Sequence, residues 1–305
     1  MDTHNILNEL STIPSEGINA TSEQIDLMST TEALHCINQQ DALVAGAVAE
    51  AIPSIAKAVD AAVSQFKKGG RLIYVGAGTS GRLGILDAVE CRPTFSVSDN
   101  VVVGIIAGGE TALINAVEGA EDDTQSAQRD LQNIGFNQDD MLIGLAASGR
   151  TPYVISAVIY ARSIRATTAC IVCNPSAPLM QIADIGICAN VGPEVLTGST
   201  RMKSGTAQKL ILNMISTATM IKLGKTYKNL MVDVQATNEK LVARAIRIVM
   251  QATECEEEVA INALALSNNN AKLAILYVLT NRDISTCQNL LKNNDGFLRN
   301  ALNEI

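Results

Sequence analysis

Blocks of apolar residues recur along the middle of the chain, and their spacing predicts two kinds of element. Short apolar, β-favouring runs lie near residues 71–75, 101–106, 140–145, 167–173 and 184–189. Stretches with apolar residues at helical spacing lie near residues 81–89, 110–121, 124–133, 152–165 and 200–223. This alternation predicts right-handed crossovers and a three-layer αβα fold, with a doubly wound parallel sheet whose sites lie at the carboxyl ends of the strands.

Helical patterns flank this α/β region on both sides. Three helices are expected before it, near 29–39, near 41–51 and from Pro53 to Gly69-Gly70. Beyond Gly224 the pattern is helical to the end of the chain. The sequence therefore predicts three parts: an N-terminal helical segment (1–60), an α/β domain (61–224) and a C-terminal helical lobe (225–305).

The first expected strand runs into a loop that is rich in glycine and hydroxyl groups. Gly76, Gly78 and Gly81 let the backbone turn sharply and approach a ligand. Thr79 and Ser80 add hydroxyls, and the start of the next helix presents unpaired N–H groups that favour an anion. The loop therefore predicts a phosphate site that includes Gly78, Thr79 and Ser80.

Two other interpretations of this loop compete with the phosphate site. Its glycines spell the G-x-G-x-x-G dinucleotide fingerprint, which needs an acidic residue about 20 positions further on. The first carboxylate after the next strand is Glu110, 29 residues beyond Gly81. A purely structural glycine turn is the second alternative, and the phosphate site remains the favoured interpretation.

A similar loop follows the third expected strand. It supplies a run of four candidate ligand residues just before Pro152, namely Ser148, Gly149, Arg150 and Thr151. Ser148 and Thr151 could equally be helix caps when each is considered alone. Two hydroxyl-rich loops in one sheet are more specific than one, so together they predict a phosphate held by hydroxyls and backbone N–H groups without a metal.

A third loop, residues 191–209, begins the longest helix of the α/β region. It carries Glu194, Ser199, Thr200, Arg201 and Lys203, of which Glu194, Ser199 and Lys203 are expected in the phosphosugar site. The alternative is a capped helix with a solvated basic turn. The density of glycine and hydroxyl groups at the end of a strand favours a wall of the ligand site.

Charge and composition exclude several classes of function. The whole net charge of −8 comes from residues 1–60, so a basic nucleic-acid-binding segment is not expected. The apolar runs are shorter than a membrane span, and no signal peptide is recognised. The chain has seven cysteines without framework spacing, which indicates reduced thiols and a cytoplasmic protein.

Metal and thiol chemistry also find little support. Cys170 and Cys173 form a C-x-x-C, but on a strand they would point to opposite faces. His4 and His35 are isolated. We therefore expect no metal and no cofactor.

Two carboxylates are the candidate catalytic groups. Glu90 is expected at the end of the helix that starts from the phosphate loop, where Pro93 would terminate it. Glu121 follows the second strand among further acidic residues. Two carboxylates from neighbouring crossovers could flank one substrate, one as acid and the other as base.

The S-G-x-T loop resembles the sugar isomerase (SIS) domain family, whose members bind phosphosugars. Six longer segments together resemble one branch of it, the N-acetylmuramic acid 6-phosphate etherases: GAGTSGRLGILDAVEC, IAGG, AVEGAEDD, AASGRTPYV, GPEVLTGSTRMKSGTAQK and NLMVDV. The resemblance implies a cofactor-independent lyase of cell-wall recycling and amino-sugar catabolism that yields N-acetylglucosamine 6-phosphate and D-lactate. It also implies that Glu90 is the proton donor and Glu121 the second catalytic acid/base.

One position departs from the family pattern, since Arg92 stands where the branch has the first proline of E-C-P-P-T.

Two other functions stay open on the residues alone, an aldose-ketose phosphosugar isomerase and a non-catalytic sensor resembling glucokinase regulatory protein. A homodimer is expected because the long apolar helices exceed what one sheet needs for cover and because SIS-family sites usually lie near a subunit interface. Lys203 and Arg201 are candidates for stabilising the enolate.

Overall fold

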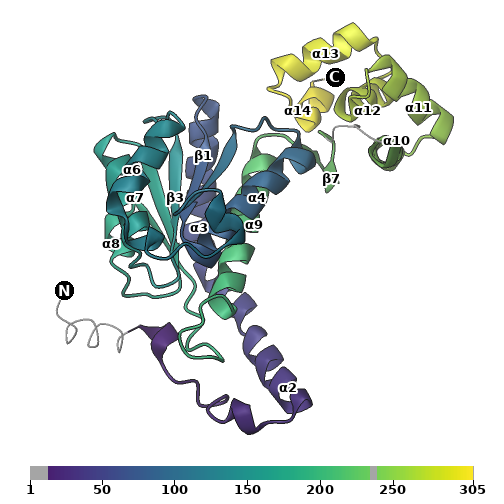
Figure 1. Ribbon diagram of the computed structural model, residues 1–305. Helices are drawn as coiled ribbons and strands as arrows, with labels where there is room; N and C mark the ends of the chain where they lie inside the picture. The colour runs from purple at the N-terminus through teal and green to yellow at the C-terminus, as the bar shows by residue number, and fades with distance from the viewer. Residues whose placement is uncertain (1–12, 234–238, 305) are drawn as a thin grey trace. The chain divides into compact units, whose positions relative to one another are not determined.

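The computed structural model describes residues 13–233 and 239–304. The chain divides into two compact units (Figure 1). The first comprises residues 1–89 and 100–216, and the second comprises residues 90–99 and 217–305. The three parts expected from the sequence remain a prediction.

The first unit is built on a five-stranded sheet in the order β2-β1-β3-β4-β5. The strands are β1 (Leu72–Gly76), β2 (Val102–Ile106), β3 (Met141–Leu145), β4 (Thr167–Val172) and β5 (Ile185–Cys188). Every neighbouring pair is parallel, so the predicted doubly wound sheet is confirmed. The strand order reverses beside β1, which places the β1 and β3 loops at the switch point where ligands bind in such sheets.

Helices cover both faces of this sheet (Figure 1). The helices α6 (Thr124–Asn133), α7 (Pro152–Ser163) and α8 (Leu179–Ile182) share one core with Ile73 and Val75 of β1. On the other face lie α3 (Val44–Lys67), α4 (Gly78–Phe95) and α9 (Lys203–Lys222). Tyr74 points to that face, where its hydroxyl donates to Asp87 of α4 at 2.9 Å.

Two prolines lie inside helices, whereas the sequence predicted that Pro53 starts a helix and that Pro93 ends one. Pro53 lies inside α3, which continues because Val48, Ala51 and Ile55 are buried on either side of it. That burial offsets the one backbone hydrogen bond that proline removes. Pro93 lies inside α4, which runs to Phe95, so Glu90 lies within the helix and not at its end.

The helix expected over residues 110–121 is also wrong. The segment forms a short helix, α5 (Thr111–Ile114), and then a 3-10 turn, η3 (Ala120–Asp122). Asn115 is extended, and Gly119 has a positive φ of 74°, so the helix cannot continue. Asp123 then caps α6 through the backbone N–H groups of Gln125 and Ser126.

The N-terminal part of the first unit packs against residues 193–198. It contains two 3-10 turns, η1 (Pro14–Glu16) and η2 (Ile25–Leu27), and α2 (Thr30–Asp41), which starts with a capping box of Ser29 and Glu32. Ser22 donates its hydroxyl to the backbone oxygen of Val195 at 2.8 Å. Asn19 donates to the backbone oxygen of Pro193 at 3.2 Å.

The stretch Thr30–Lys67 is long and apolar enough to cross a membrane by length and composition, an outcome that the sequence analysis did not anticipate. Its larger helix, α3, contacts strands β3 and β5. Buried alanine and valine side chains form that contact, as in the core helix of a globular domain.

The second unit is helical apart from a hairpin that the sequence analysis missed. Strands β6 (Thr226–Tyr227) and β7 (Leu230–Met231) pair antiparallel around Lys228, which has a positive φ of 54°. Five helices follow, namely α10 (Glu239–Thr253), α11 (Glu257–Leu266), α12 (Ala271–Thr280), α13 (Ile284–Asn293) and α14 (Leu298–Asn303). Residues 234–238, which belong to the stretch beyond Gly224 that was expected to be helical, lie outside the described residues.

Candidate active site

The corner between β1 and α4 is the centre of the candidate site. A Cβ atom on Gly76 would lie 2.7 Å from the backbone nitrogen of Gly81, and one on Gly81 would lie 2.6 Å from Ile106 Cγ1. Only glycine permits this approach of α4 to the end of the sheet. The N–H groups at the first turn, from Gly78 to Ser80, therefore have no intrahelical acceptor and are directed toward the carboxyl edge.

Ser80 contacts a residue that the sequence analysis did not select. Its hydroxyl donates to the side-chain oxygen Oε1 of Gln208 at 2.8 Å. Gln208 is 1% exposed, and its Nε2 group has no hydrogen-bond partner among the described residues. A buried amide donor without a partner is costly, and this one lies beside a candidate phosphate ligand.

The loop between β3 and α7 holds the second group of predicted ligands. Thr151 is the N-cap of α7, but its side chain makes no capping hydrogen bond. Ser148 Oγ accepts a hydrogen bond from the backbone nitrogen of Arg150 at 3.3 Å. The interpretation of Thr151 as a mere side-chain cap is thus wrong.

Neighbouring residues fix the backbone of that loop. Gly149 has a positive φ of 67°, and a Cβ there would lie 2.3 Å from Ala177 Cβ. Asn174, which is 2% exposed, donates to the backbone oxygen of Ser148 at 3.3 Å. The hydroxyls of Ser148 and Thr151 are therefore presented by a rigid loop.

The loop before α9 holds the third group of candidate ligand residues, and two of them are buried. Glu194 is fully buried, and its carboxylate accepts from the backbone nitrogens of Lys203 at 3.0 Å and Ser204 at 2.9 Å. Lys203 is 1% exposed and donates from Nζ to Gln40 Oε1 at 3.0 Å. Burial lowers the pKa of Lys203, opposed by the nearby carboxylates of Glu194 and Asp41. Ser199 is half-buried and Arg201 is exposed.

Glu121 lines a cavity of about 180 Å³ at the carboxyl ends of β1 and β2. Gly78 and Arg82 of α4 line it together with Glu118 and Glu121 of the segment that follows β2. Arg82 donates from Nε to the backbone oxygen of Leu113 at 3.1 Å. The cavity therefore joins the start of α4 with one of the two candidate catalytic carboxylates.

Glu90 belongs to the second unit, so its pairing with Glu121 rests on the resemblance. It is exposed on α4, and its backbone oxygen accepts from Thr94 Oγ1 at 2.7 Å. Arg92, the departure from the family pattern, pairs with Asp99, with 2.6 Å between Nε and Oδ1.

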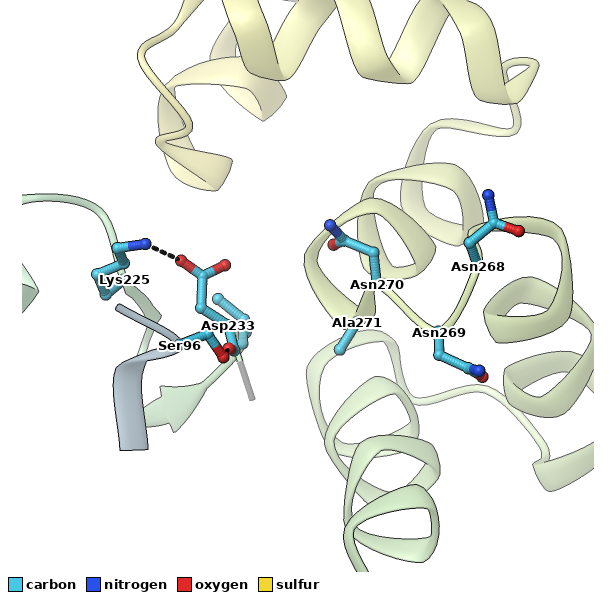
Figure 2. A pocket seen from close by; sticks show the side chains of 8 residues that line it. Ser96, Lys225, Asp233, Asn268, Asn269, Asn270 and Ala271 are labelled. Carbon is cyan, nitrogen blue, oxygen red and sulfur yellow. Dashed lines mark hydrogen bonds and ion pairs between the residues drawn. The ribbon is translucent and has the colours of Figure 1, made fainter. Parts of the chain in front are cut away.

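The second unit contains a polar cavity of its own, of about 380 Å³ (Figure 2). Lys225 and Asp233 lie on one side of it, and Asn268, Asn269 and Asn270 lie on the other. Asp233 pairs with Lys225 at 3.1 Å and with Lys272 at 2.9 Å. The charged residues that line this cavity are thus already paired. None of the candidate site residues predicted from the sequence lines it.

The cysteines and acidic residues add no second chemistry to the described part of the chain. Burial raises the pKa of both Cys170 and Cys173 to about 12, so both thiols stay protonated. Within residues 13–233 and 239–304, no three His, Cys, Asp or Glu side chains gather as a metal site would require.

The parallel sheet, with hydroxyl-bearing loops after β1 and β3, is the core of an SIS domain. Family profiles agree: "SIS domain" matches residues 113–218, "Glucokinase regulatory protein N-terminal SIS domain" matches residues 54–162, and "C-terminal lid domain of glucokinase regulatory protein" matches residues 228–272. The chain belongs to the N-acetylmuramic acid 6-phosphate etherase family, because it is 57% identical to one such etherase over 98% of both chains.

The relatives that place it there match over almost their whole length. An N-acetylmuramic acid 6-phosphate etherase of Pseudoalteromonas atlantica is 57% identical over 300 residues, which are 98% of each chain. N-acetylmuramic acid 6-phosphate etherase 2 of Vibrio cholerae is 58% identical over 97% of this chain and 96% of its own. Outside that family, a solved structure of a phosphoheptose isomerase from Francisella tularensis is 19% identical and covers 64% of this chain and 100% of its own, with a TM-score of 0.49.

Proposed function

We propose that the protein is a lyase that cleaves the D-lactyl ether of N-acetylmuramic acid 6-phosphate, yielding N-acetylglucosamine 6-phosphate and D-lactate. The observation that carries the proposal is the 57% identity to an etherase over 98% of both chains. Such a reaction belongs to cell-wall recycling and amino-sugar catabolism.

The phosphate is assigned to the two hydroxyl-bearing loops. The first-turn N–H groups of α4 and the hydroxyls of Thr79 and Ser80 lie after β1, and Ser148 to Thr151 lie after β3. The unused Thr151 side chain and the start of α4 support this assignment, because both offer donors at the carboxyl edge of one sheet. Ser199, Glu194 and Lys203 complete the proposed site from the third loop. Glu194 and Lys203 are buried, so they would act by fixing the start of α9.

The chemistry needs proton transfer and no hydride. In the open-chain sugar, the C1 aldehyde makes the C2 proton removable by a carboxylate, which leaves an enolate. Protonation of the ether oxygen lets lactate leave from C3, and water then adds at C3. We assign the C2 proton to Glu121, which lines the cavity beside Gly78, and protonation of the leaving oxygen to Glu90.

The experiment that tests the proposal follows solvent atoms into the products. The reaction is run in deuterated, heavy-oxygen water, and both products are fragmented in a mass spectrometer. Elimination and hydration predict deuterium at C2 and heavy oxygen at C3 of the sugar, with none at the C2 hydroxyl of lactate. Fragments must separate C1 from C3, because the aldehyde also exchanges. Heavy oxygen on the lactate hydroxyl would overturn the mechanism.

A sugar-phosphate sensor is the second candidate, because two family profiles from glucokinase regulatory protein match the chain. Lactate release from the substrate would exclude it. An aldose-ketose isomerase would convert the sugar without releasing lactate.

We further propose a cytoplasmic homodimer. The N-terminal helices α2 and α3 and the residues between them carry exposed leucine and isoleucine side chains: Leu34 is 61% exposed, Leu43 55% and Ile52 50%. Exposed apolar side chains that gather on one surface mark a site of association, and we propose that these three do so. Seven free cysteines agree with a reducing compartment. Light scattering at micromolar concentration should give the mass of two chains, and a single-chain mass would reject the dimer.

A further inference from the structure

Arg82 is a charged residue of the Glu121 cavity for which the reaction above has no use. It lies four residues after Gly78 on α4, so both face the same side of the helix, and both line the cavity. Its Nε donates to the backbone oxygen of Leu113 at 3.1 Å, and its Nη2 donates to that of Asn115 at 3.5 Å. A guanidinium has five N–H donors, so this anchoring leaves donors for a ligand.

Arg82 is the cationic group that an anionic ligand would contact in this cavity, among its described lining residues. Its charged lining consists of Arg82 and two carboxylates, those of Glu118 and Glu121. An anionic group that entered would meet two like charges, and Arg82 is the one lining residue that would attract it. The guanidinium fork also matches the two oxygens of a carboxylate.

Ser80 and Arg82 face different sides of the same helix end. They are two residues apart, which is about 200° around the helix axis. Ser80 is directed toward Gln208 of α9, whereas Arg82 is directed toward the segment that follows β2. A ligand that lies across the start of α4 therefore meets hydroxyls on one side and a guanidinium on the other.

We infer that Arg82 binds the carboxylate of the lactyl group and so selects the ether substrate over other sugar phosphates. The inference rests on the proposed function, whose substrate carries two anions, the 6-phosphate and the lactyl carboxylate. The phosphate is assigned to the Ser80 side of α4. The carboxylate would then enter the Glu121 cavity, where Arg82 holds it while the C3–O bond breaks. Arg82 transfers no proton and acts as a specificity-determining residue.

The test exploits a sugar that lacks the carboxylate. N-acetylglucosamine 6-phosphate needs the phosphate loops and the base in order to exchange its C2 proton with solvent, but it has nothing for Arg82 to bind. Arg82→Gln should lower kcat/KM for ether cleavage about 10- to 100-fold, the effect of losing a charge-assisted, bidentate contact. The rate of C2 exchange, measured by NMR in deuterated water, should stay within about threefold of the wild-type rate. Added D-lactate should inhibit the wild-type chain, because its carboxylate can bind Arg82, and should not inhibit the variant. Arg82→Lys should be intermediate, because it keeps the charge without the fork.

Arg129→Gln is the matched control, because Arg129 is an exposed arginine of α6 that pairs with Asp123 across 3.6 Å. It should alter neither activity. If Arg82→Gln lowers cleavage and exchange equally, Arg82 only supports the Leu113 to Asn115 backbone and the inference is wrong. If neither falls, the inference is also wrong. A wild-type chain that releases no lactate would reject the proposed function itself.

Discussion

Ser80 Oγ donates to Gln208 Oε1 at 2.8 Å, while Nε2 of the same amide is buried without a partner among the described residues. In this arrangement the Ser80 proton is committed to Gln208. Turning the amide over would place Nε2 against Ser80 Oγ, give the buried donor an acceptor and free the hydroxyl proton for an anion. The pair is therefore suited to change its hydrogen-bond direction when phosphate binds.

Gln208→Glu tests this exchange. A carboxylate can accept from Ser80 but cannot donate to it, and it adds a negative charge beside the phosphate. Calorimetry with N-acetylglucosamine 6-phosphate should show binding weakened by more than about 1.5 kcal/mol. Gln208→Met, which removes both polar groups, should bind more tightly than the glutamate variant. Wild-type affinity in both variants would show that the amide plays no part.

Thr151→Ala should separate ligand binding from helix capping. Because the hydroxyl makes no capping bond, the variant should lose less than about 0.5 kcal/mol of stability. Phosphosugar affinity should fall by about 1–3 kcal/mol, as for Ser148→Ala.

Ser29→Ala is the matched control for that experiment, since the Ser29 side chain does cap α2. It should cost about 0.5–2 kcal/mol in urea unfolding and leave affinity unchanged. A Thr151→Ala variant that unfolds as easily as Ser29→Ala would contradict the prediction.

The two glutamates should fail in different ways. Glu121→Gln should lose both ether cleavage and C2 proton exchange of the product sugar, because the base is gone. Glu90→Gln should cleave poorly but still exchange the C2 proton, because exchange needs no leaving-group acid. NMR of the sugar in deuterated water measures exchange directly. Equal exchange in the two variants would reject this division of roles.

Asp87 should make stability depend on pH. Burial raises its pKa above 3.8, although hydrogen bonds from Tyr74 and Ser216 oppose the shift. A raised folded-state pKa means that the native state holds the proton more tightly than the unfolded chain. Its stabilising contribution is therefore present below about pH 4 and is lost as pH rises through the folded-state value.

Asp87→Asn provides the measurement, because asparagine does not titrate and keeps both contacts possible. The unfolding free energy of the wild-type chain minus that of the variant should fall as pH rises from about 4 to 7. A difference that rises with pH would mean that the carboxylate is stabilised in its ionised form.

The sheet was predictable because its central strands are buried on both faces and give unbroken apolar runs, as in β1 and β3. The connections were harder. Apolar spacing over residues 110–121 looked helical, but the conformations of Asn115 and Gly119 end the helix, and backbone geometry of this kind leaves no periodic signal. Pro53 was read as a start because local sequence does not show how well the rest of α3 packs on the sheet.

The candidate site also contains residues that the sequence predicted and residues that only the structure reveals. Hydroxyl-rich loops after strands were visible in the sequence because parallel strands bring their carboxyl ends to one edge. Gln208 and Arg82 were not, since one lies 128 residues from its partner Ser80 and the other looks like any surface arginine of a helix. Glu194 was selected for its position, but only the fold reveals that its oxygens are occupied by the first N–H groups of α9.

That occupancy has a consequence for where anions can settle. Among the helices that start at the carboxyl edge of the sheet, α9 carries the carboxylate of Glu194 on its first N–H groups and α6 carries that of Asp123, and each carboxylate opposes the positive end of the helix dipole. Glu194 thus acts as an internal counter-ion at the start of α9, and the first turns of α4 and α7 remain for the phosphate that we assign to them. A Glu194→Gln substitution would remove this negative charge, so that the start of α9 would become a second place where an anion could bind.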